Sequence, residues 1–257
     1  MTADRFVEVP GGKIYVKIWN PVAAVDSRPL ILIHDSLGCV RLWRDFPNLL
    51  CEKLQRPIIA YDRLGFGQST KREGLPSKRF ISEEAEAILP ALLSSQNINQ
   101  FDLYGYSVGG AMAIACAALH EDRCHSILTE ATQAFVEDKT IEGLQKAKKD
   151  FSNPAKLDKL RKYHGDKTEW ILSAWFDIWL DPSFADWSVA PFLPQVRCPV
   201  LCLHGDRDEY GTIAFPKMIC NLAGGPSEMH ILKDCGHTPH REKQKTVLDL
   251  AGRFFNP

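Results

Sequence analysis

A serine flanked by glycines, Ser107 in the stretch Gly105–Gly110, is the residue of this sequence best placed to act as a nucleophile. An aromatic-rich run at 101–106 predicts a strand before it, and small residues at 109–119 predict a helix after it. Glycines two positions either side of a serine permit a very sharp strand-to-helix turn that exposes the hydroxyl above the sheet. The same pattern also occurs by chance at ordinary strand–turn–helix junctions, so residues elsewhere in the chain must distinguish the two.

A base and an acid that could activate this serine follow later in the chain. Acyl transfer by a serine needs a base within hydrogen-bond reach and an acid that holds the tautomer of that base. Asp208 comes four residues after a predicted strand ending at His204, and His237 comes five residues after one ending at Leu232. Such positions lie just beyond the carboxyl ends of parallel strands, where side chains converge. We therefore predict a nucleophile–acid–base triad of Ser107, Asp208 and His237.

The elements that must position this triad follow a strand–helix rhythm. A hairpin is predicted over residues 6–19, and apolar runs typical of buried strands recur at 30–34, 57–62, 101–106, 126–130, 199–204 and 227–232. Helices are predicted near 42–53, 82–94 (with Ser82 as the N-cap), 109–119, 212–222 and 242–255. Strands that alternate with helices indicate βαβ units, so the predicted fold class is α/β with a mostly parallel sheet.

This rhythm lapses between residues 133 and 194, where the chain reads as helical, polar at first and then aromatic. Its lysines alternate with acidic residues, which favours a solvated helix face over a binding patch. Trp175 and Trp179 are one helical turn apart and share an apolar face. They either form the core of the insertion or line a ligand cavity. The sequence thus predicts one core domain, residues 1–132 and 195–257, with an inserted helical cap at 133–194.

Composition excludes several classes of function. The 257 residues carry a formal net charge of −1, which gives no support to binding of nucleic acid or of an anionic membrane. No apolar run has the length of a signal peptide or a membrane span, so we expect a cytoplasmic protein. The eight cysteines are scattered without a C-x-x-C pair, which favours free thiols over disulfides or a metal site. The sequence leaves a homodimer open.

With these residues in view, the chain resembles the α/β-hydrolase superfamily over essentially its whole length. Four local patterns carry the resemblance: residues 34–38 (HDSLG), residues 62–69 (DRLGFGQS), the serine turn, and residues 205–208 (GDRD) with 235–237 (CGH). The resemblance implies an eight-stranded, mostly parallel sheet with helices on both faces and a helical cap after strand six. It also implies that Ser107, Asp208 and His237 form the catalytic triad, and that Asp208 rather than Asp206 is the acid.

The family pattern also implies an oxyanion hole made by the backbone N–H groups of Ser36 and Val108. One departure is that the family usually has glycine where this sequence has Asp35, and that glycine lets the backbone bend toward the oxyanion. Asp35 could adopt the same turn, accept a hydrogen bond from the substrate or repel anionic ligands. A hole that lacked one donor would lose roughly 3 kcal/mol of transition-state stabilisation.

Neighbouring residues have expected roles beside the triad. His240 is an alternative base but is expected to begin the last helix. His34 is expected to be a structural histidine beneath the oxyanion turn, with Asp62 and Arg63 bracing adjacent loops. The substrate site is expected to include five residues: Asp35, Leu37, Tyr106, Trp175 and Trp179.

The predicted activity is hydrolysis of a hydrophobic carboxylic ester or lactone through an acyl-enzyme on Ser107, without a metal or an organic cofactor. Residues 34–38 and 204–211 resemble those of a bacterial subgroup that includes quorum-quenching N-acyl-homoserine lactonases, which makes these lactones a candidate substrate. Carbon–carbon bond hydrolases and enol-lactonases of aromatic degradation share the same skeleton. A ligand receptor on a hydrolase scaffold is a further alternative, of a different class.

Overall fold

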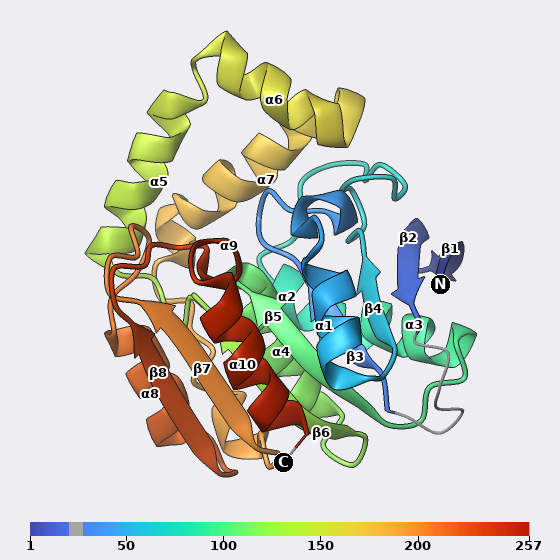
Figure 1. Ribbon diagram of the computed structural model, residues 1–257. Coiled ribbons are helices and arrows are strands. Elements are labelled where there is room, and N and C mark those ends of the chain that lie inside the picture. The colour runs from blue at the N-terminus through green and yellow to red at the C-terminus, as the bar shows by residue number, and fades with distance from the viewer. Residues whose placement is uncertain (21–27, 257) are drawn as a thin grey trace.

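An eight-stranded sheet forms the centre of the computed structural model, which describes residues 1–20 and 28–256 (Figure 1). The strand order is β1-β2-β4-β3-β5-β6-β7-β8; only β2 runs against its neighbours, and the remaining pairs are parallel. The strands are β1 (Thr2–Val9), β2 (Gly12–Trp19), β3 (Leu30–Ile33), β4 (Ile58–Tyr61), β5 (Phe101–Tyr106), β6 (Cys124–Glu130), β7 (Val200–Gly205) and β8 (Ser227–Leu232). The predicted mostly parallel, eight-stranded α/β sheet is confirmed.

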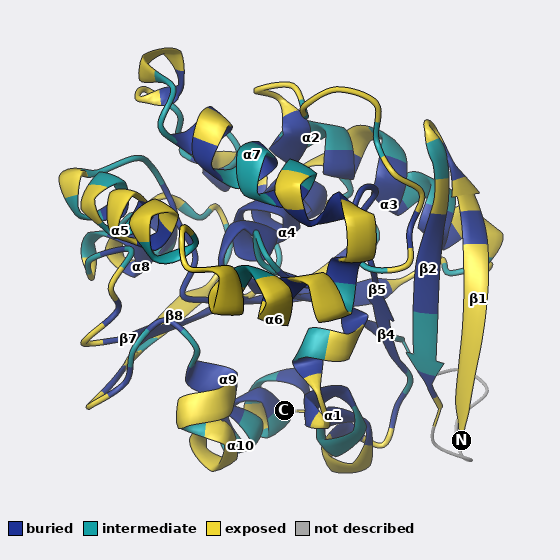
Figure 2. Cartoon of the chain, turned by 90° about the horizontal axis from the view of Figure 1, so that it is seen from above, coloured by how far each residue is buried: buried dark blue, intermediate teal, exposed yellow. Residues whose placement is uncertain are grey.

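Side chains of the central strands alternate between two hydrophobic layers, because successive residues of a strand point to opposite faces. In β3, Ile31 and Ile33 pack on one side of the sheet, and Leu30 and Leu32 pack on the other. Helices α1 (Phe46–Leu54) and α10 (Gln244–Phe255) cover the second face. Helices α3 (Leu89–Ser95), α4 (Val108–Leu119) and α8 (Ala214–Leu222) cover the first, as the view from above shows (Figure 2). Both faces are thus shielded, as a parallel sheet requires.

Helix boundaries depart from the predictions where proline or a tight turn intervenes. The expected helix 42–53 is a 3-10 turn (Val40–Trp43) followed by α1. The expected helix 82–94 begins earlier, as α2 (Phe80–Glu83), widens into a π turn (Glu84–Ile88) and continues as α3. Pro90 has no N–H to donate to the preceding turn, which accounts for the wider π geometry. Ser82 therefore lies inside the helix and is not its N-cap. The predicted last helix is divided into α9 (Pro239–Glu242) and α10.

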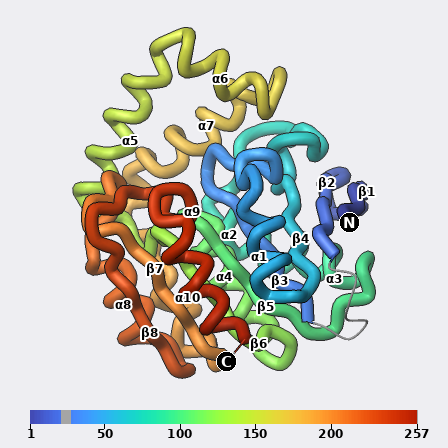
Figure 3. Tube along the Cα trace, viewed as in Figure 1, coloured from blue at the N-terminus to red at the C-terminus, as the bar shows by residue number. Residues whose placement is uncertain are grey.

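The segment between β6 and β7 forms the helical layer above the carboxyl ends of the strands (Figure 3). It contains α5 (Asp138–Asp150), α6 (Pro154–His164) and α7 (Thr168–Trp179). At its base Phe135 and Ser188 form an isolated antiparallel bridge, which brings the two ends of the insertion together. The division of the chain at residues 132/133 and 194/195 stays a prediction. Among the described residues, no helix combines the length and the apolar composition that crossing a membrane requires.

Two buried side chains join this cap to the core. The Gly67 N–H donates to His164 Nδ1 at 3.0 Å, and His164 Nε2 in turn donates to the Leu37 carbonyl at 3.0 Å. Lys167 Nζ donates to the Gly67 carbonyl at 2.5 Å and to the Ser69 carbonyl at 2.6 Å. Burial lowers the pKa of His164 and that of Lys167. These two side chains therefore hold the cap through main-chain atoms of the loops that follow β3 and β4.

At the opposite end of β5, a buried ion pair gives a prediction for stability. The Asp102 side chain is fully buried and accepts from Arg56 Nη1 at 2.8 Å, and also from Arg28 Nε at 2.9 Å. Replacing Asp102 with alanine leaves the buried Arg56 charge unpaired, so we expect a loss of about 3–5 kcal/mol in the free energy of unfolding. Urea denaturation measures this. As a control, Asp249→Ala, which removes a partly exposed surface carboxylate paired with Lys53 and Lys245, should change the stability by about 1 kcal/mol or less.

Candidate active site

The turn that carries Ser107 is sharp and strained. Ser107 has φ 56° and ψ −126°, a conformation that non-glycine residues rarely adopt, at the junction of β5 and α4. A Cβ on Gly109 would lie 2.1 Å from the Ile33 carbonyl oxygen, and one on Gly105 would lie 2.3 Å from the Gly109 carbonyl oxygen. Larger residues at either position would push the helix off the sheet, so the two glycines are what allows the serine to project above the strand ends.

The structure brings the three predicted triad residues into one hydrogen-bonded chain. Ser107 Oγ lies 3.0 Å from His237 Nε2, and His237 Nδ1 lies 2.9 Å from both carboxylate oxygens of Asp208. The alternative acid, Asp206, instead accepts from the Cys235 N–H. The alternative base, His240, is buried in α9 against Glu130, with Nδ1 2.9 Å from Oε1. Neither rival is bonded to Ser107 or His237 in the described part of the chain.

Opposite pKa shifts accompany the contact between His237 and Asp208. Burial acts to lower the pKa of His237, but the charge and the hydrogen bond of Asp208 outweigh it and raise the pKa above its usual value. Burial acts to raise the pKa of Asp208, but His237 outweighs that effect and lowers the pKa. An ionised Asp208 fixes the proton of a neutral His237 on Nδ1, so Nε2 presents its lone pair to the serine hydroxyl.

Two backbone N–H groups lie beside the nucleophile on the side of β3. Those of Ser36 and Val108 donate to no acceptor among the described residues, and Ser36 lines the cavity at Ser107. The turn is braced from below, because the Arg63 N–H donates to His34 Nε2 at 3.0 Å, and His34 Nδ1 donates to the Asp35 carbonyl at 2.8 Å. The expectation that His34 is structural is confirmed.

Asp35 fits this turn without strain. It is not among the residues with positive φ, and its Oδ2 accepts from the Leu37 N–H at 3.3 Å. The aspartate side chain therefore folds back onto its own loop and replaces the usual glycine without a left-handed backbone.

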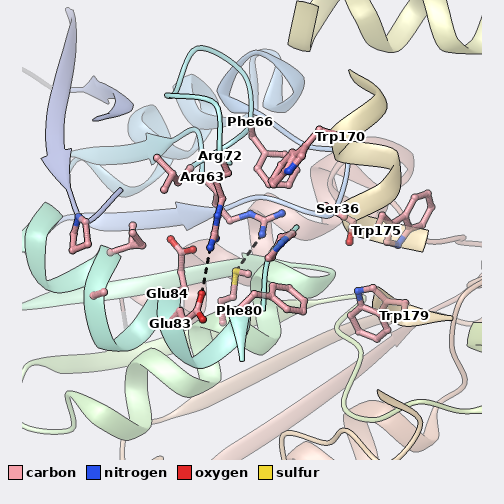
Figure 4. Close-up of a pocket in the computed structure, with 17 residues that line it drawn as sticks. Ser36, Arg63, Phe66, Arg72, Phe80, Glu83, Glu84, Trp170, Trp175 and Trp179 are labelled. Carbon is pink, nitrogen blue, oxygen red and sulfur yellow. Dashed lines mark hydrogen bonds and ion pairs between the residues drawn. The ribbon is translucent and has the colours of Figure 1, made fainter. Parts of the chain in front are cut away.

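Two neighbouring cavities lie between the core and the cap. A cavity of about 20 Å³ is lined by Ser107, His237 and residues of the cap. A second one, of about 260 Å³, lies toward α2 and the loop after β4 and shares the lining residues Ser36, Trp175 and Trp179 with the first. Figure 4 shows the tryptophans of α7 on one side of the larger cavity and Arg63, Phe66 and Phe80 across from them. Its walls are mostly apolar and suit a hydrocarbon group, with four charged side chains, Arg63, Arg72, Glu83 and Glu84, at its edge toward α2.

The residues expected to contact substrate divide into two groups. Trp175 and Trp179 line both cavities. Leu37 lines a groove between α5 and Tyr210 instead, and Asp35 lines neither that groove nor the two cavities. The Tyr106 hydroxyl lies 3.1 Å from Thr238 Oγ1, and its ring packs against His237. Substrate contact by these five residues stays a prediction, and the geometry supports it best for the two tryptophans.

Sequence reasoning missed two residues of the site. Gln133 lies in the small cavity, with Oε1 3.2 Å from Ser107 Oγ. Arg63, expected only to brace a loop, does so through a bond from Nη2 to the Asp35 carbonyl but also lines the larger cavity. Gln133 follows the end of β6 by three residues, so the rule that located Asp208 and His237 after strand ends could have found it.

This strand order, together with a nucleophilic serine on the sharp turn after β5, is typical of the α/β-hydrolase fold. Comparison with known families gives the same result. A family model described as "alpha/beta hydrolase fold" matches residues 28–163, which is more than half of the chain. The chain therefore belongs to the α/β-hydrolase family and is a hydrolase of that fold.

Individual relatives are distant. The 2-hydroxy-6-oxo-2,4-heptadienoate hydrolase of Pseudomonas putida is 24% identical over 253 residues, covering 89% of each chain. Serine hydrolase BPHL of Homo sapiens is 25% identical over 204 residues, covering 77% of this chain and 69% of that protein. The crystal structure of carboxylesterase CesB from Bacillus subtilis superposes with a TM-score of 0.74 at 17% identity, covering 100% of this chain and 92% of that one. At that identity the likeness shows the fold alone.

Proposed function

We propose that this protein is a serine hydrolase that cleaves carboxylic esters or lactones through an acyl-enzyme on Ser107. The observation that carries the proposal is the chain of contacts from Ser107 Oγ through His237 to the buried Asp208, at 3.0 and 2.9 Å. These distances lie within the range that proton transfer between a nucleophile and its base requires.

The proposed reaction has two halves, formation of the acyl-enzyme and its hydrolysis, and His237 transfers protons in both. His237 Nε2 takes the Ser107 proton as Oγ attacks the carbonyl carbon, and the N–H groups of Ser36 and Val108 donate to the oxyanion. The imidazolium then protonates the leaving oxygen, and water hydrolyses the acyl-enzyme. The chemistry needs no metal or organic cofactor in its mechanism.

The larger cavity supports an acyl group of medium length. Its volume of about 260 Å³ is about twenty times the roughly 10–15 Å³ that one water molecule needs, so it has room for an acyl chain of several carbon atoms. Aliphatic esters, or N-acyl-homoserine lactones whose acyl chains have that size, are the proposed substrates.

Filling this cavity should change chain-length preference. Ala174 is buried in α7 and lines the larger cavity. Ala174→Phe is expected to lower kcat/KM for p-nitrophenyl octanoate by about 5- to 150-fold, since overpacking costs about 1–3 kcal/mol, while hydrolysis of the acetate changes about twofold or less. Ala155→Phe, on the exposed face of α6, is the matched control. An equal loss on both esters would place the acyl chain elsewhere.

A phosphonate that reacts with activated serines tests the proposed function directly. We expect one covalent adduct, located by peptide mass spectrometry on Ser107, and a loss of ester and lactone hydrolysis in proportion to labelling. Substrates are p-nitrophenyl esters of graded length with acyl-homoserine lactones alongside. Labelling of another residue, or ester hydrolysis that persists in the fully labelled protein, would overturn the proposal. A ligand receptor on this scaffold would show binding without turnover of any ester or lactone.

A second candidate is hydrolysis of a carbon–carbon bond beside a ketone. The Pseudomonas putida relative, whose name states such a dienoate substrate, matches over 89% of both chains and so includes the cap. Incubation with a 2-hydroxy-6-oxo-dienoate, followed by its visible absorbance, distinguishes this activity from ester hydrolysis. Turnover of the dienoate at a rate well above that of any ester would favour the second candidate.

A further inference from the structure

Gln133 lies directly against the nucleophile. Its Oε1 is 3.2 Å from Ser107 Oγ, the residue is only 7% exposed, and it lines the small cavity with His237. It comes from the loop after β6, on the opposite side of β5 from the oxyanion turn after β3. The amide is therefore placed on the side of the triad histidine and away from the N–H groups of Ser36 and Val108.

The backbone that delivers Gln133 is specially shaped for this approach. Ala131, the first residue after β6, has φ 48°, a left-handed conformation that is costly for a residue with a side chain. The next residue, Thr132, packs so close to α4 that a Cβ on Gly110 would lie 1.7 Å from its Oγ1. The strained backbone at Ala131 and the close packing of Thr132 on α4 thus bring the amide of Gln133 to Ser107. Backbone strain of this kind is typical of functional sites.

The balance of hydrogen-bond donors and acceptors at Ser107 Oγ differs between the free enzyme and the acyl-enzyme. In the free enzyme, one hydroxyl proton faces two acceptors, His237 Nε2 at 3.0 Å and Gln133 Oε1 at 3.2 Å. In an acyl-enzyme Oγ has no proton, so both acceptors lose their donor at once. A water molecule has two O–H groups and can donate to both acceptors, each of which lies within hydrogen-bond distance of the same atom, Ser107 Oγ.

In the free structure, the small cavity at Ser107 is large enough to admit one water molecule and has polar walls. Its volume of about 20 Å³ exceeds the roughly 10–15 Å³ that one water needs. His237, Gln133 and Ser107 supply polar partners on its wall, within the two to four that a held water requires.

We propose that Gln133 is a catalytic residue of deacylation, holding the hydrolytic water through Oε1; this rests on the proposed function. One O–H of the water gives its proton to His237 Nε2 as the water oxygen bonds to the acyl carbon. The second O–H donates to Gln133 Oε1 throughout. The carbon–Oγ bond then breaks, the proton on Nε2 returns to Ser107 Oγ, and the carboxylic acid leaves.

Burst kinetics with competing methanol tests this role. Gln133→Met keeps the length of the side chain and removes the acceptor, and Gln133→Glu keeps an acceptor oxygen. For Gln133→Met we expect the rate of the p-nitrophenol burst, which reports acylation, to stay within about twofold. The steady-state rate, which reports deacylation, should fall about tenfold. Methanol has one O–H, which His237 takes, so methyl ester formation should persist and the ester-to-acid product ratio should rise about tenfold.

Three controls keep the outcomes distinct. Gln133→Glu should retain a product ratio near that of the wild type, and Gln244→Met on the exposed start of α10 should change nothing. Equal slowing of hydrolysis and methanolysis in Gln133→Met, or an unchanged product ratio, would overturn the inference and leave a structural role. If the wild type gives no p-nitrophenol burst, or gives a burst that Ser107→Ala also shows, the proposed function itself is overturned. This comparison does not involve the Gln133 variants, so the two failures can be told apart.

Discussion

Ser107→Ala is expected to lower kcat/KM for a p-nitrophenyl ester by roughly 10⁶-fold, the scale seen when a nucleophilic serine is removed. The variant cannot form the acyl-enzyme, and only the oxyanion donors and binding contacts remain to accelerate attack by water. Steady-state kinetics on the same ester, with KM determined separately, measures the loss. It should fall almost wholly on kcat, because the cavities that hold the substrate are unchanged.

The backbone at this position supplies a control for folding. Alanine at φ 56° bears the same strain as serine, so Ser107→Ala should unfold at nearly the wild-type temperature. Ser107→Gly relieves the strain and is expected to stabilise the protein by about 1 kcal/mol while remaining equally inactive. An alanine variant that retains more than a few per cent of wild-type kcat would show that the chemistry lies elsewhere.

Asp208→Asn is expected to lower kcat about 10⁴-fold with little change in fold. Asparagine has nearly the same shape but can present its amide hydrogens to His237 Nδ1, which then keeps its lone pair and places the proton on Nε2. The histidine can no longer accept the serine proton. Kinetics on an activated ester, with a circular dichroism spectrum as the check on folding, measures the effect. A loss below tenfold would favour Asp206 as the acid.

The pH dependence of the wild type and this variant should differ in a defined direction. Neutral His237 is the active form, and Asp208 raises its pKa above the usual 6.5. The kcat/KM of the wild type should therefore reach its maximum at pH values above that raised pKa and fall as the pH drops through it. Without the carboxylate charge the pKa of His237 falls, so the acid limb of the residual Asp208→Asn activity should move to lower pH. A limb that does not move would mean that another group titrates.

The triad residues were predictable because each lies at a fixed, short distance from the end of a strand. Apolar runs identify the parallel strands, and a parallel sheet brings its carboxyl ends together, so Asp208 and His237 could be placed beside Ser107 without knowledge of the packing. The serine turn also has a local signature in its two glycines.

Other features depended on contacts that the sequence does not display. The sequence did not show that the Tyr106 ring packs against His237 or that its hydroxyl is hydrogen-bonded to Thr238, and its contact with substrate stays a prediction. The reach of Gln133 to the nucleophile follows from the left-handed backbone at Ala131. The residue types around Ala131 do not predict that conformation, since alanine rarely adopts a positive φ. The extent of the helix before β5 was obscured by Pro90, which alters the turn rather than ending the helix.

The joint between cap and core has a consequence for engineering. His164 and Lys167 bind the N–H and carbonyl groups of Gly67, Leu37 and Ser69, which are main-chain atoms present whatever the side chains are. These bonds ask of the core only a backbone shape, and the side-chain requirements on the core come from a few residues such as Arg41, which donates to the Lys162 carbonyl, and Lys78, which pairs with Asp181. Residues 133–194 should therefore behave as a transplantable part, which a related core with the same loop geometry and these two basic side chains can receive together with its tryptophan-lined cavity.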